Sequence, residues 1–278
     1  MSRPDSSGGQ RPWLIAHRGA NAEAPENTMA AFDAAMAHGV DGLEFDVQMT
    51  GDGVPVIFHD DTLKRMTGER GSVSDYPHNA VAGFETGARY SGKWRAAAIP
   101  DLEAVLAAYA DRAVLMIELK AVGRAGDAAD RKNRLARRVV ECIERRVNNT
   151  TRGNLLILSF DADILAAARH LAPDLNFILN SKKPFAAPPP AQDGSSWLFG
   201  YGVPLYRLTR EFVRACHKAG QMVMTYSCNS ETEIDRALAM EVDALLTDDP
   251  GRVGPYFTSG TKGLQSSGAL TGKQGGRG

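Results

Sequence analysis

The chain has 278 residues, a formal net charge of −1, and 43% hydrophobic and 23% charged residues. These values are ordinary for a soluble globular protein, and the balanced charge argues against a general nucleic-acid binder, which would be clearly basic. No apolar run approaches the ~18 residues of a membrane span, and residues 1–12 lack the apolar core of a signal peptide.

Polar, Gly- and Ser-rich segments at 1–12 and 258–278 are expected to be disordered tails, because they cannot bury enough apolar surface to offset the entropy of ordering. Short apolar runs between them predict strands over 13–17, 42–49, 54–59, 113–120, 154–160, 175–179, 198–203, 222–228 and 243–247. Helical periodicity predicts helices over 27–39, 101–110, 130–147, 161–172, 209–220 and 230–241. The expected N-caps are Asn27, Asp101, Asp161, Thr209 and Ser230, and the expected helix stops are Gly39 and Gly220.

This alternation is typical of parallel strands joined by helical crossovers. Eight strands fit the parallel set, with 54–59 as an additional hairpin arm, so we predict an α/β fold, a closed (β/α)8 TIM barrel over 13–257. Residues 61–100 hold no long helical pattern and indicate a small insertion after the second strand. Prolines 188–190 forbid a regular helix where one is due after the fifth barrel strand.

Two of the predicted strands carry charged residues where parallel strands are normally apolar throughout. Side chains alternate along a strand, so Glu44 and Asp46 share one face of 42–49, and Glu118 and Lys120 share one face of 113–120. In a barrel the mixed face points inward, and these residues lie at the carboxyl ends of their strands, where barrel active sites are built.

Three inward carboxylates cannot all stay ionised side by side without a counter-charge. A hard divalent cation supplies one, and Mg²⁺ or Ca²⁺ prefers oxygen ligands, with Mn²⁺ as a further candidate. We therefore predict that Glu44, Asp46 and Glu118 bind one divalent cation. The alternative is a set of structural ion pairs with Arg18 and Lys120.

The segment "MTGDGV" contains an Asp-Gly pair between two strand patterns, a strong hairpin signal. A loop of Asp52 and Gly53 would place His59 opposite Asp46, and a loop of Gly51 and Asp52 would place it opposite Glu44. His17 ends the first strand at the same barrel mouth. Two histidines, three carboxylates and two cations at one rim are hard to explain as core packing.

A charge count extends this interpretation. Three carboxylates contribute −3, and a divalent cation with Arg18 and Lys120 contributes +4. The remainder of +1 suits a phosphodiester, which carries one negative charge. We therefore expect an anionic substrate, with the two histidines as a general acid and base.

The segment "HRGANAEAPENTMAAFDAAMAHGVDGLEFDVQMTGDGVPVIFHDDTLKRMTG" resembles the signature of the glycerophosphodiester phosphodiesterases. The resemblance continues through "IPDLEAVL", "IELK", "LSF", "AGQMVMTYSCN" and "DALLTDDP", over roughly residues 13–250. It implies a (β/α)8 barrel with an insertion after the second strand, and an enzyme of lipid and glycerol metabolism. Its reaction would be metal-dependent hydrolysis of glycerophosphodiesters to an alcohol and sn-glycerol 3-phosphate.

By position, the resemblance implies metal ligands at Glu44, Asp46 and Glu118, an acid/base pair at His17 and His59, and phosphate-contacting cations at Arg18 and Lys120. Relatives usually have Trp where this chain has Tyr226, a residue that lines the mouth. We also consider Trp94, in the insertion with Tyr90 and Phe84, a substrate-pocket candidate; these aromatic residues either line the entrance or form a local core.

Several alternatives stay open. Phospholipase C/D-like cleavage of a phospholipid or lysophospholipid is the second hypothesis, and a glycoside hydrolase would leave the histidines and cations without roles. Asp60, Asp61, Asp248 and Asp249 are interpreted as turn and helix-start residues rather than a second metal site. The sequence does not identify the head-group alcohol, the metal, which histidine is the acid, or the oligomeric state.

Three cysteines, Cys142, Cys216 and Cys228, form an odd set without metal-ligand spacing. We predict that they are reduced, mostly buried thiols and that the protein is cytoplasmic.

Overall fold

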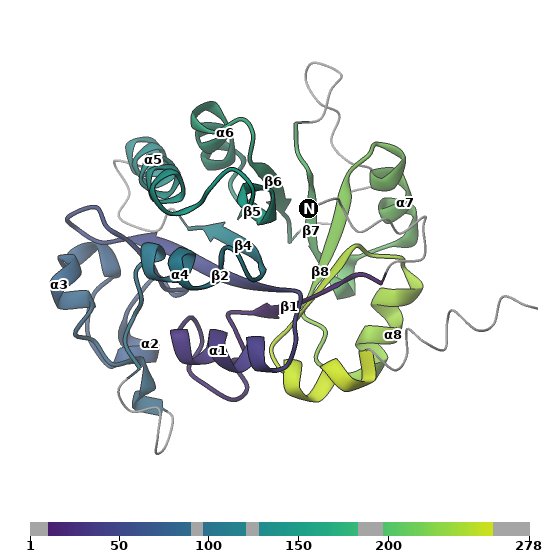
Figure 1. Cartoon of the computed structure of the whole chain (residues 1–278), viewed down its shortest axis with the longest axis horizontal. Helices are drawn as coiled ribbons and strands as arrows, with labels where there is room; N and C mark the ends of the chain where they lie inside the picture. Colours follow the sequence, from purple (N-terminus) through teal and green to yellow (C-terminus); the bar gives the residue numbers. More distant parts are fainter. Residues whose placement is uncertain (1–10, 90–96, 121–127, 183–196, 258–278) are drawn as a thin grey trace, which may run out of the picture.

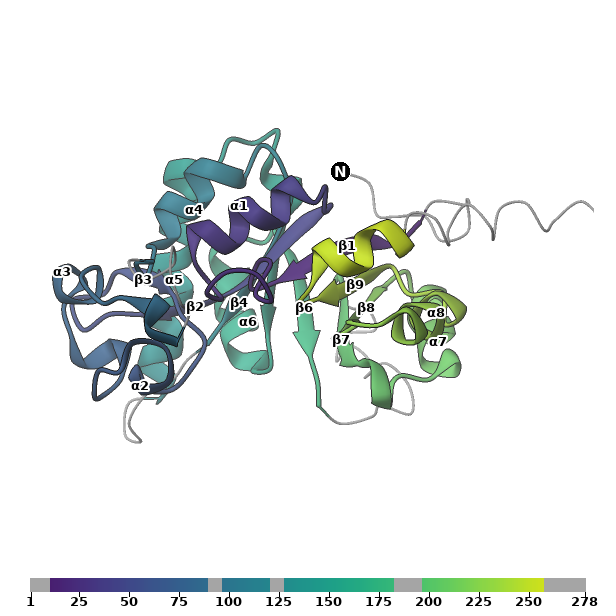
Figure 2. The same ribbon diagram turned by 90° about the horizontal axis from the view of Figure 1, so that it is seen from below.

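A computed structural model of the chain describes residues 11–89, 97–120, 128–182 and 197–257. Eight parallel strands form the barrel, and pairing of the first strand, β1, with both β9 and β2 closes it. The helices surround the strands, as Figures 1 and 2 show. The predicted (β/α)8 barrel is confirmed.

The strands are β1 Trp13–His17, β2 Gly42–Met49, β3 Pro55–Ile57, β4 Val114–Leu119, β5 Leu155–Ser159, β6 Asn176–Asn180, β7 Gly200–Pro204, β8 Met222–Tyr226 and β9 Ala244–Thr247. The main helices are α1 Met29–Ala37, α4 Leu102–Tyr109, α5 Ala128–Arg146, α6 Ala162–Leu171, α7 Arg210–Lys218 and α8 Glu231–Ala239. A last helix, which the sequence reasoning did not predict, covers 250–257. Within the described ranges no helix is both long and apolar enough to cross a membrane.

The two faces of the strands lie in different cores. Leu43, Phe45 and Leu115 belong to the large core between barrel and helices, whereas Met116 and Leu158 belong to a smaller core inside the barrel. The alternation predicted for 42–49 and 113–120 is therefore confirmed. The inward face of β2 carries its charged residues into the barrel.

Helix ends follow the predicted caps with one exception. Asp101, Asp161, Thr209 and Ser230 each accept a hydrogen bond from the first turn of their helix. Asn27 is not the cap of α1, because Thr28 takes that position and accepts from the Ala31 N–H at 3.2 Å.

Residues 61–89 form a separate lobe of short helices, α2 Lys64–Thr67 and α3 His78–Val81 with the 3-10 turns η1 Val73–Asp75 and η2 Thr86–Arg89. The lobe lies to one side of the barrel in both views, and Figure 2 shows it beside β3 (Figures 1 and 2). Phe84 packs edge-on against Tyr76 at the margin of a small core of its own, so for this residue the local-core alternative is correct. Tyr90, Trp94 and the proline-rich 184–190 lie outside the described residues.

Candidate active site

A cavity of about 220 Å³ opens at the carboxyl ends of the barrel strands. The predicted acid/base pair, metal ligands, cations and Tyr226 all line it, whereas Trp94 lies outside the described residues. The cavity-lining residues are His17, Arg18, Glu44, Asp46, His59, Glu118, Lys120, Leu158, Phe160, Asn180, Lys182, Met224, Tyr226 and Leu246.

The carboxylate cluster consists of Glu44, Asp46 and Glu118, which offer oxygens within 4.8 Å of one another. Parallel pairing of β2 with β4 places Asp46 directly beside Glu118. Burial and the charge of Asp46 raise the pKa of Glu44 to about 8 and that of Glu118 to about 7. Burial alone would also raise the pKa of Asp46, but Arg18 and Lys120 lower it. The cluster therefore lacks enough positive charge to keep three carboxylates ionised at neutral pH.

Amide groups hold two members of the cluster in place. The Asn27 Nδ2 donates to Asp46 Oδ2 at 2.9 Å, and its Oδ1 accepts from the Asp46 N–H at 3.3 Å. The Asn180 Nδ2 donates to Glu118 Oε2 at 3.0 Å. Both asparagines are buried. Asn27, expected to start a helix, is thus a supporting residue of the cluster.

A left-handed turn after β1 brings the Arg18 side chain over the carboxylate cluster. Arg18 has φ 59° and Gly19 has φ 79°. A Cβ on Gly19 would lie 2.6 Å from the Ala31 backbone, so only glycine fits between β1 and α1. The Arg18 N–H donates to the Glu44 carbonyl at 2.8 Å. A backbone held in a sparsely populated region is a feature that recurs at functional sites.

Two cations lie at the cluster. The Arg18 Nε is 3.2 Å from Asp46 Oδ2, and the Lys120 Nζ is 3.6 Å from both Asp46 and Glu118. The Nε of Arg18 is buried and makes no hydrogen bond of good geometry within the described part of the chain. It can therefore donate to a further acceptor.

His17 is oriented by an aspartate at the end of β9. Its Nδ1 lies 2.7 Å from Asp248 Oδ1, and its Nε2 lies 3.9 Å from Glu44 Oε2. Asn21 and Asn229 donate to the two Asp248 oxygens at 2.7 and 2.6 Å. An Nδ1–H bonded to Asp248 leaves Nε2 to face the cluster. Burial alone would lower the pKa of His17, but the hydrogen bond to Asp248 and the charge of Glu44 raise it.

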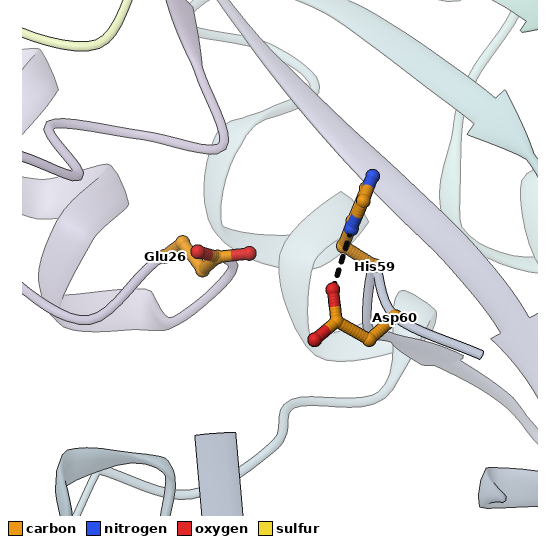
Figure 3. Close-up of side chains that lie close together, drawn as sticks. All are labelled: Glu26, His59 and Asp60. Atoms are coloured by element: carbon orange, nitrogen blue, oxygen red, sulfur yellow. Dashed lines mark hydrogen bonds and ion pairs between the residues drawn. The ribbon is translucent and has the colours of Figure 1, made fainter. Parts of the chain in front are cut away.

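His59 has an equivalent partner in Asp60, with Nδ1 and Oδ1 2.8 Å apart (Figure 3). Arg65 bonds both Asp60, at 2.5 and 2.7 Å, and Glu26, at 2.7 Å. Arg18 also donates to Glu26, at 2.9 Å. Burial lowers the pKa of His59, and the opposing charge of Asp46 does not offset this.

Glu26, His59 and Asp60 also lie close enough to share an ion. Their carboxylates are already neutralised by Arg65 and Arg18, and each oxygen of Glu26 accepts from a guanidinium. The group is therefore a salt-bridge network that fixes His59 and Arg18, and the buried carboxylate cluster is the better cation site.

Both predicted hairpin registers are wrong, although the hairpin itself is confirmed. Val47 pairs with Ile57 and Met49 with Pro55, and the Thr50 N–H donates to the Val54 carbonyl at 3.0 Å. The loop thus has three residues rather than two, which shifts the register by one. β3 ends at Ile57, so strand alternation does not set the direction of His59, which lines the cavity from the segment that follows.

The other side of the cavity, formed by residues on or just after β5, β6, β8 and β9, is largely apolar. Phe160 and Tyr226 form an edge-to-face pair with ring centroids 6.5 Å apart, which we call the aromatic wall. The Tyr226 hydroxyl and the Asn180 Oδ1 are buried without a hydrogen-bond partner among the described residues. Such atoms indicate groups that a substrate can bind.

Sequence reasoning missed Asn27, Asn180, Lys182 and the roles of Asp60 and Asp248. The sequence predicts Asp60 and Asp248 only as turn or helix-start residues. The same prediction for Asp249 agrees with the structure, because Asp249 accepts from the Arg252 N–H at the start of the last helix. A carboxylate next to a suspected catalytic histidine in the sequence could have identified Asp60. Asp248 is 231 residues from His17, and only closure of the barrel brings the two together.

Comparison with known proteins agrees with this geometry. Residues 17–252 match the profile of the Glycerophosphoryl diester phosphodiesterase family. A glycerophosphodiester phosphodiesterase of Bacillus altitudinis is 31% identical over 245 residues, covering 86% of this chain and 95% of the relative. One from Caldanaerobacter subterraneus is 30% identical over 246 residues, covering 85% and 94%.

Solved structures show the same similarity. A phosphodiesterase of Oleispira antarctica, in complex with the product sn-glycerol 3-phosphate, has a TM-score of 0.77 at 26% identity, covering 89% of this chain and 97% of the other. A putative glycerophosphoryl diester phosphodiesterase of Silicibacter pomeroyi has a TM-score of 0.77 at 27% identity, covering 93% and 98%. The chain therefore belongs to the glycerophosphoryl diester phosphodiesterase family and is an enzyme of that class.

Proposed function

We propose that this enzyme hydrolyses glycerophosphodiesters to an alcohol and sn-glycerol 3-phosphate, with a divalent cation on the carboxylate cluster and His17 and His59 as the acid/base pair. The observation that carries the proposal is the convergence of three buried carboxylates, two cations and two aspartate-bonded histidines on one cavity. The relative from Oleispira antarctica, which binds sn-glycerol 3-phosphate, supports the choice of product.

The carboxylate cluster fits a divalent cation of the Mg²⁺ or Ca²⁺ type, with Mn²⁺ also suited, because its three ligands are oxygens that converge within 4.8 Å. The raised pKa values of Glu44 and Glu118 indicate that the cluster needs more positive charge than Arg18 and Lys120 provide. When bound, such an ion polarises the phosphoryl group and offsets charge in the transition state.

Arg18 and Lys120 hold the phosphate in this proposal. The buried Arg18 Nε lies 3.2 Å from Asp46 Oδ2 but makes no hydrogen bond of good geometry within the described residues, so it can donate to a non-bridging oxygen. The Lys120 Nζ lies 3.6 Å from carboxylate oxygens of Asp46 and Glu118. It adds a second positive charge for the non-bridging oxygens of the phosphate. Fixed donors of this kind stabilise developing charge without reorganisation.

The histidines move the protons. In each, Nδ1 is bonded to an aspartate, so the Nε2 is the nitrogen left for substrate. One histidine accepts the proton of the nucleophile, and the other donates a proton to the leaving alcohol. The nucleophile is water, or the neighbouring glycerol hydroxyl in a route through a cyclic phosphate. ³¹P NMR at early reaction times distinguishes the two routes, because a cyclic phosphate has its own resonance.

The glycerol hydroxyls have candidate partners on the other side of the cavity. The Asn180 Oδ1 and the Tyr226 hydroxyl are buried, line the cavity and have no partner among the described residues. An unpaired buried polar atom costs about 1–3 kcal/mol, so a substrate hydroxyl that pairs with it gains affinity.

The test is product analysis with each glycerophosphodiester, with EDTA and after each metal is added back. We expect sn-glycerol 3-phosphate as the phosphorylated product, no reaction in EDTA, and recovery with one divalent ion. Release of the alcohol phosphate instead would mean that the other ester bond is cut. No reaction of the folded protein with any metal would favour phospholipase C/D-like chemistry, and lysophospholipids would then be the substrates to assay.

We also propose a cytoplasmic location. Cys142, Cys216 and Cys228 are buried and form no disulfide with one another, as is usual in proteins of a reducing compartment. Cell fractionation with immunodetection tests this, and recovery in an oxidising compartment would contradict it.

A further inference from the structure

The aromatic side of the cavity carries one charged side chain among the described residues that line it, Lys182. Every lining carboxylate within the described ranges belongs to the carboxylate cluster on β2 and β4. The remaining lining residues on the aromatic side are Leu158, Phe160, Asn180, Met224, Tyr226 and Leu246.

Lys182 lies two residues beyond the end of β6, and its ammonium is 5.3 Å from the centroid of the Phe160 ring. Lys182 is exposed, and it forms no ion pair with a carboxylate of the described residues. No described carboxylate therefore offsets its charge. The exposed face of the aromatic wall already has a cation over it.

A second aromatic residue nearby shows the same arrangement. Tyr206 is 67% exposed and close enough to Tyr226 to influence the ionisation of that hydroxyl. The guanidinium of Arg207 lies 5.2 Å from the centroid of the Tyr206 ring. Two exposed aromatic rings, Phe160 and Tyr206, thus each lie close to a cation of the chain itself.

One arm of the substrate must leave the cavity towards solvent, because head-group alcohols differ in size. The residues around the phosphate position are largely enclosed: side chains of Arg18 and Lys120 are 17% exposed, and the carboxylate cluster is buried. Phe160 is 41% exposed and Lys182 is exposed. Phe160 and Lys182 are the two exposed residues among the described residues that line the cavity, so we infer that the head group leaves the phosphate past the aromatic wall and Lys182.

Choline and ethanolamine groups are commonly bound over aromatic faces or beside carboxylates. On this path the described residues offer no carboxylate outside the carboxylate cluster, and the exposed rings of Phe160 and Tyr206 each already have a cation of the chain nearby. An uncompensated ammonium instead attracts an anionic group and repels a cationic one.

Building on the proposed function, we propose that Lys182 selects the head group, so that the enzyme prefers glycerophosphodiesters whose alcohol carries a negative charge over those whose alcohol carries an ammonium group. The glycerol 3-phosphate part of the substrate is common to all and contributes nothing to this choice. Lys182 acts as a specificity-determining residue and takes no part in proton transfer.

The test uses three diesters of sn-glycerol 3-phosphate of nearly equal size, made with glycolate, ethylene glycol and ethanolamine. Their terminal groups are a carboxylate, a hydroxyl and an ammonium. We expect kcat/KM to fall in that order, with about a tenfold difference between first and last, because their terminal groups differ by two unit charges and each contributes about threefold near a solvent-exposed lysine. Raising the KCl concentration should reduce the difference.

Lys182→Gln should bring the three kcat/KM values together, and Lys182→Glu should reverse their order. Lys218→Gln is the matched control, because Lys218 is exposed at the end of α7 and does not line the cavity. The control should keep the order of the unaltered protein.

Four results would overturn the proposal, and they are distinguishable. Equal kcat/KM values in the unaltered protein at low salt, or an order that persists in Lys182→Glu, would reject the head-group role alone. A uniform loss on all three substrates in Lys182→Gln would place the lysine at the common glycerol phosphate part. No hydrolysis of any diester by folded, Mg²⁺-supplemented protein would reject the proposed function itself.

Discussion

The carboxylate cluster and the aromatic wall line one cavity, yet they are built in different ways. Glu44, Asp46 and Glu118 are buried and crowded, and amide donors hold Asp46 and Glu118 in place. The aromatic wall is apolar, is partly exposed at Phe160, and has a lysine without a described carboxylate partner beside it. Strong, rigid electrostatics suit the reacting phosphate, whereas an open, weakly charged surface suits an alcohol that varies between substrates.

The largest expected effect is loss of a histidine on the carboxylate side. His17→Ala and His59→Ala should each lower kcat by about 10²–10⁴-fold, the usual contribution of a general acid or base. His170, exposed on α6, is the control, and His170→Ala should leave kcat unchanged. Steady-state kinetics checks this, and a flat pH profile of kcat/KM between pH 5 and 9 would contradict a paired-histidine scheme.

The next effect concerns the cation. Glu44→Gln should weaken Mg²⁺ binding by more than the ~10–100-fold typical of supporting residues, with the fold retained. In the unaltered protein, the pKa values of about 8 for Glu44 and about 7 for Glu118 mean that protons compete with the ion. Affinity should therefore be higher at pH 8.5 than at pH 6. Calorimetric titration at both pH values measures this; equal affinity at both would show that the ion binds elsewhere.

A smaller effect is expected from the residue that orients His17. Asp248→Asn keeps the size of the side chain but removes its charge, so the pKa of His17 should fall, since the hydrogen bond to Asp248 helps to raise it. We expect kcat to drop by about 10–10²-fold, less than for His17→Ala, because orientation is impaired while the imidazole stays. NMR titration of His17 separates this role from a purely structural one, which would leave the pKa of a folded variant unchanged.

The smallest effect is on stability. Burial alone would raise the pKa of Asp60, but the hydrogen bonds of Arg65 and His59 lower it to about 2. A lowered carboxyl pKa stabilises the fold above the unfolded pKa of about 3.9, and this stability is lost as the pH falls towards 2. Asp60→Asn should thus reduce the free energy of unfolding at pH 7, and the difference should shrink below pH 4. Urea denaturation at several pH values tests this, and a pH-independent difference would contradict it.

The carboxylate side of the cavity could be predicted from the sequence, whereas most of the aromatic side could not. Glu44, Asp46 and Glu118 break the apolar pattern of parallel strands, so their face and their barrel end follow from alternation alone. The prediction that His59 lies at the barrel mouth agrees with the structure although both predicted registers are wrong, because either two-residue loop would bring His59 to the same mouth. Asn180, Lys182 and the pairing of His17 with Asp248 depend on how distant strands meet around the barrel, which no local pattern encodes.

The most direct test of the account is whether the cation and the phosphate meet at the carboxylate cluster. Mn²⁺ bound to the protein should strongly increase the ³¹P relaxation rate of sn-glycerol 3-phosphate, beyond the effect of Mn²⁺ free in solution, and Glu118→Gln should remove most of the increase. Mn²⁺ that binds to the unaltered protein without this increase would place the ion away from the phosphate and contradict the proposed site.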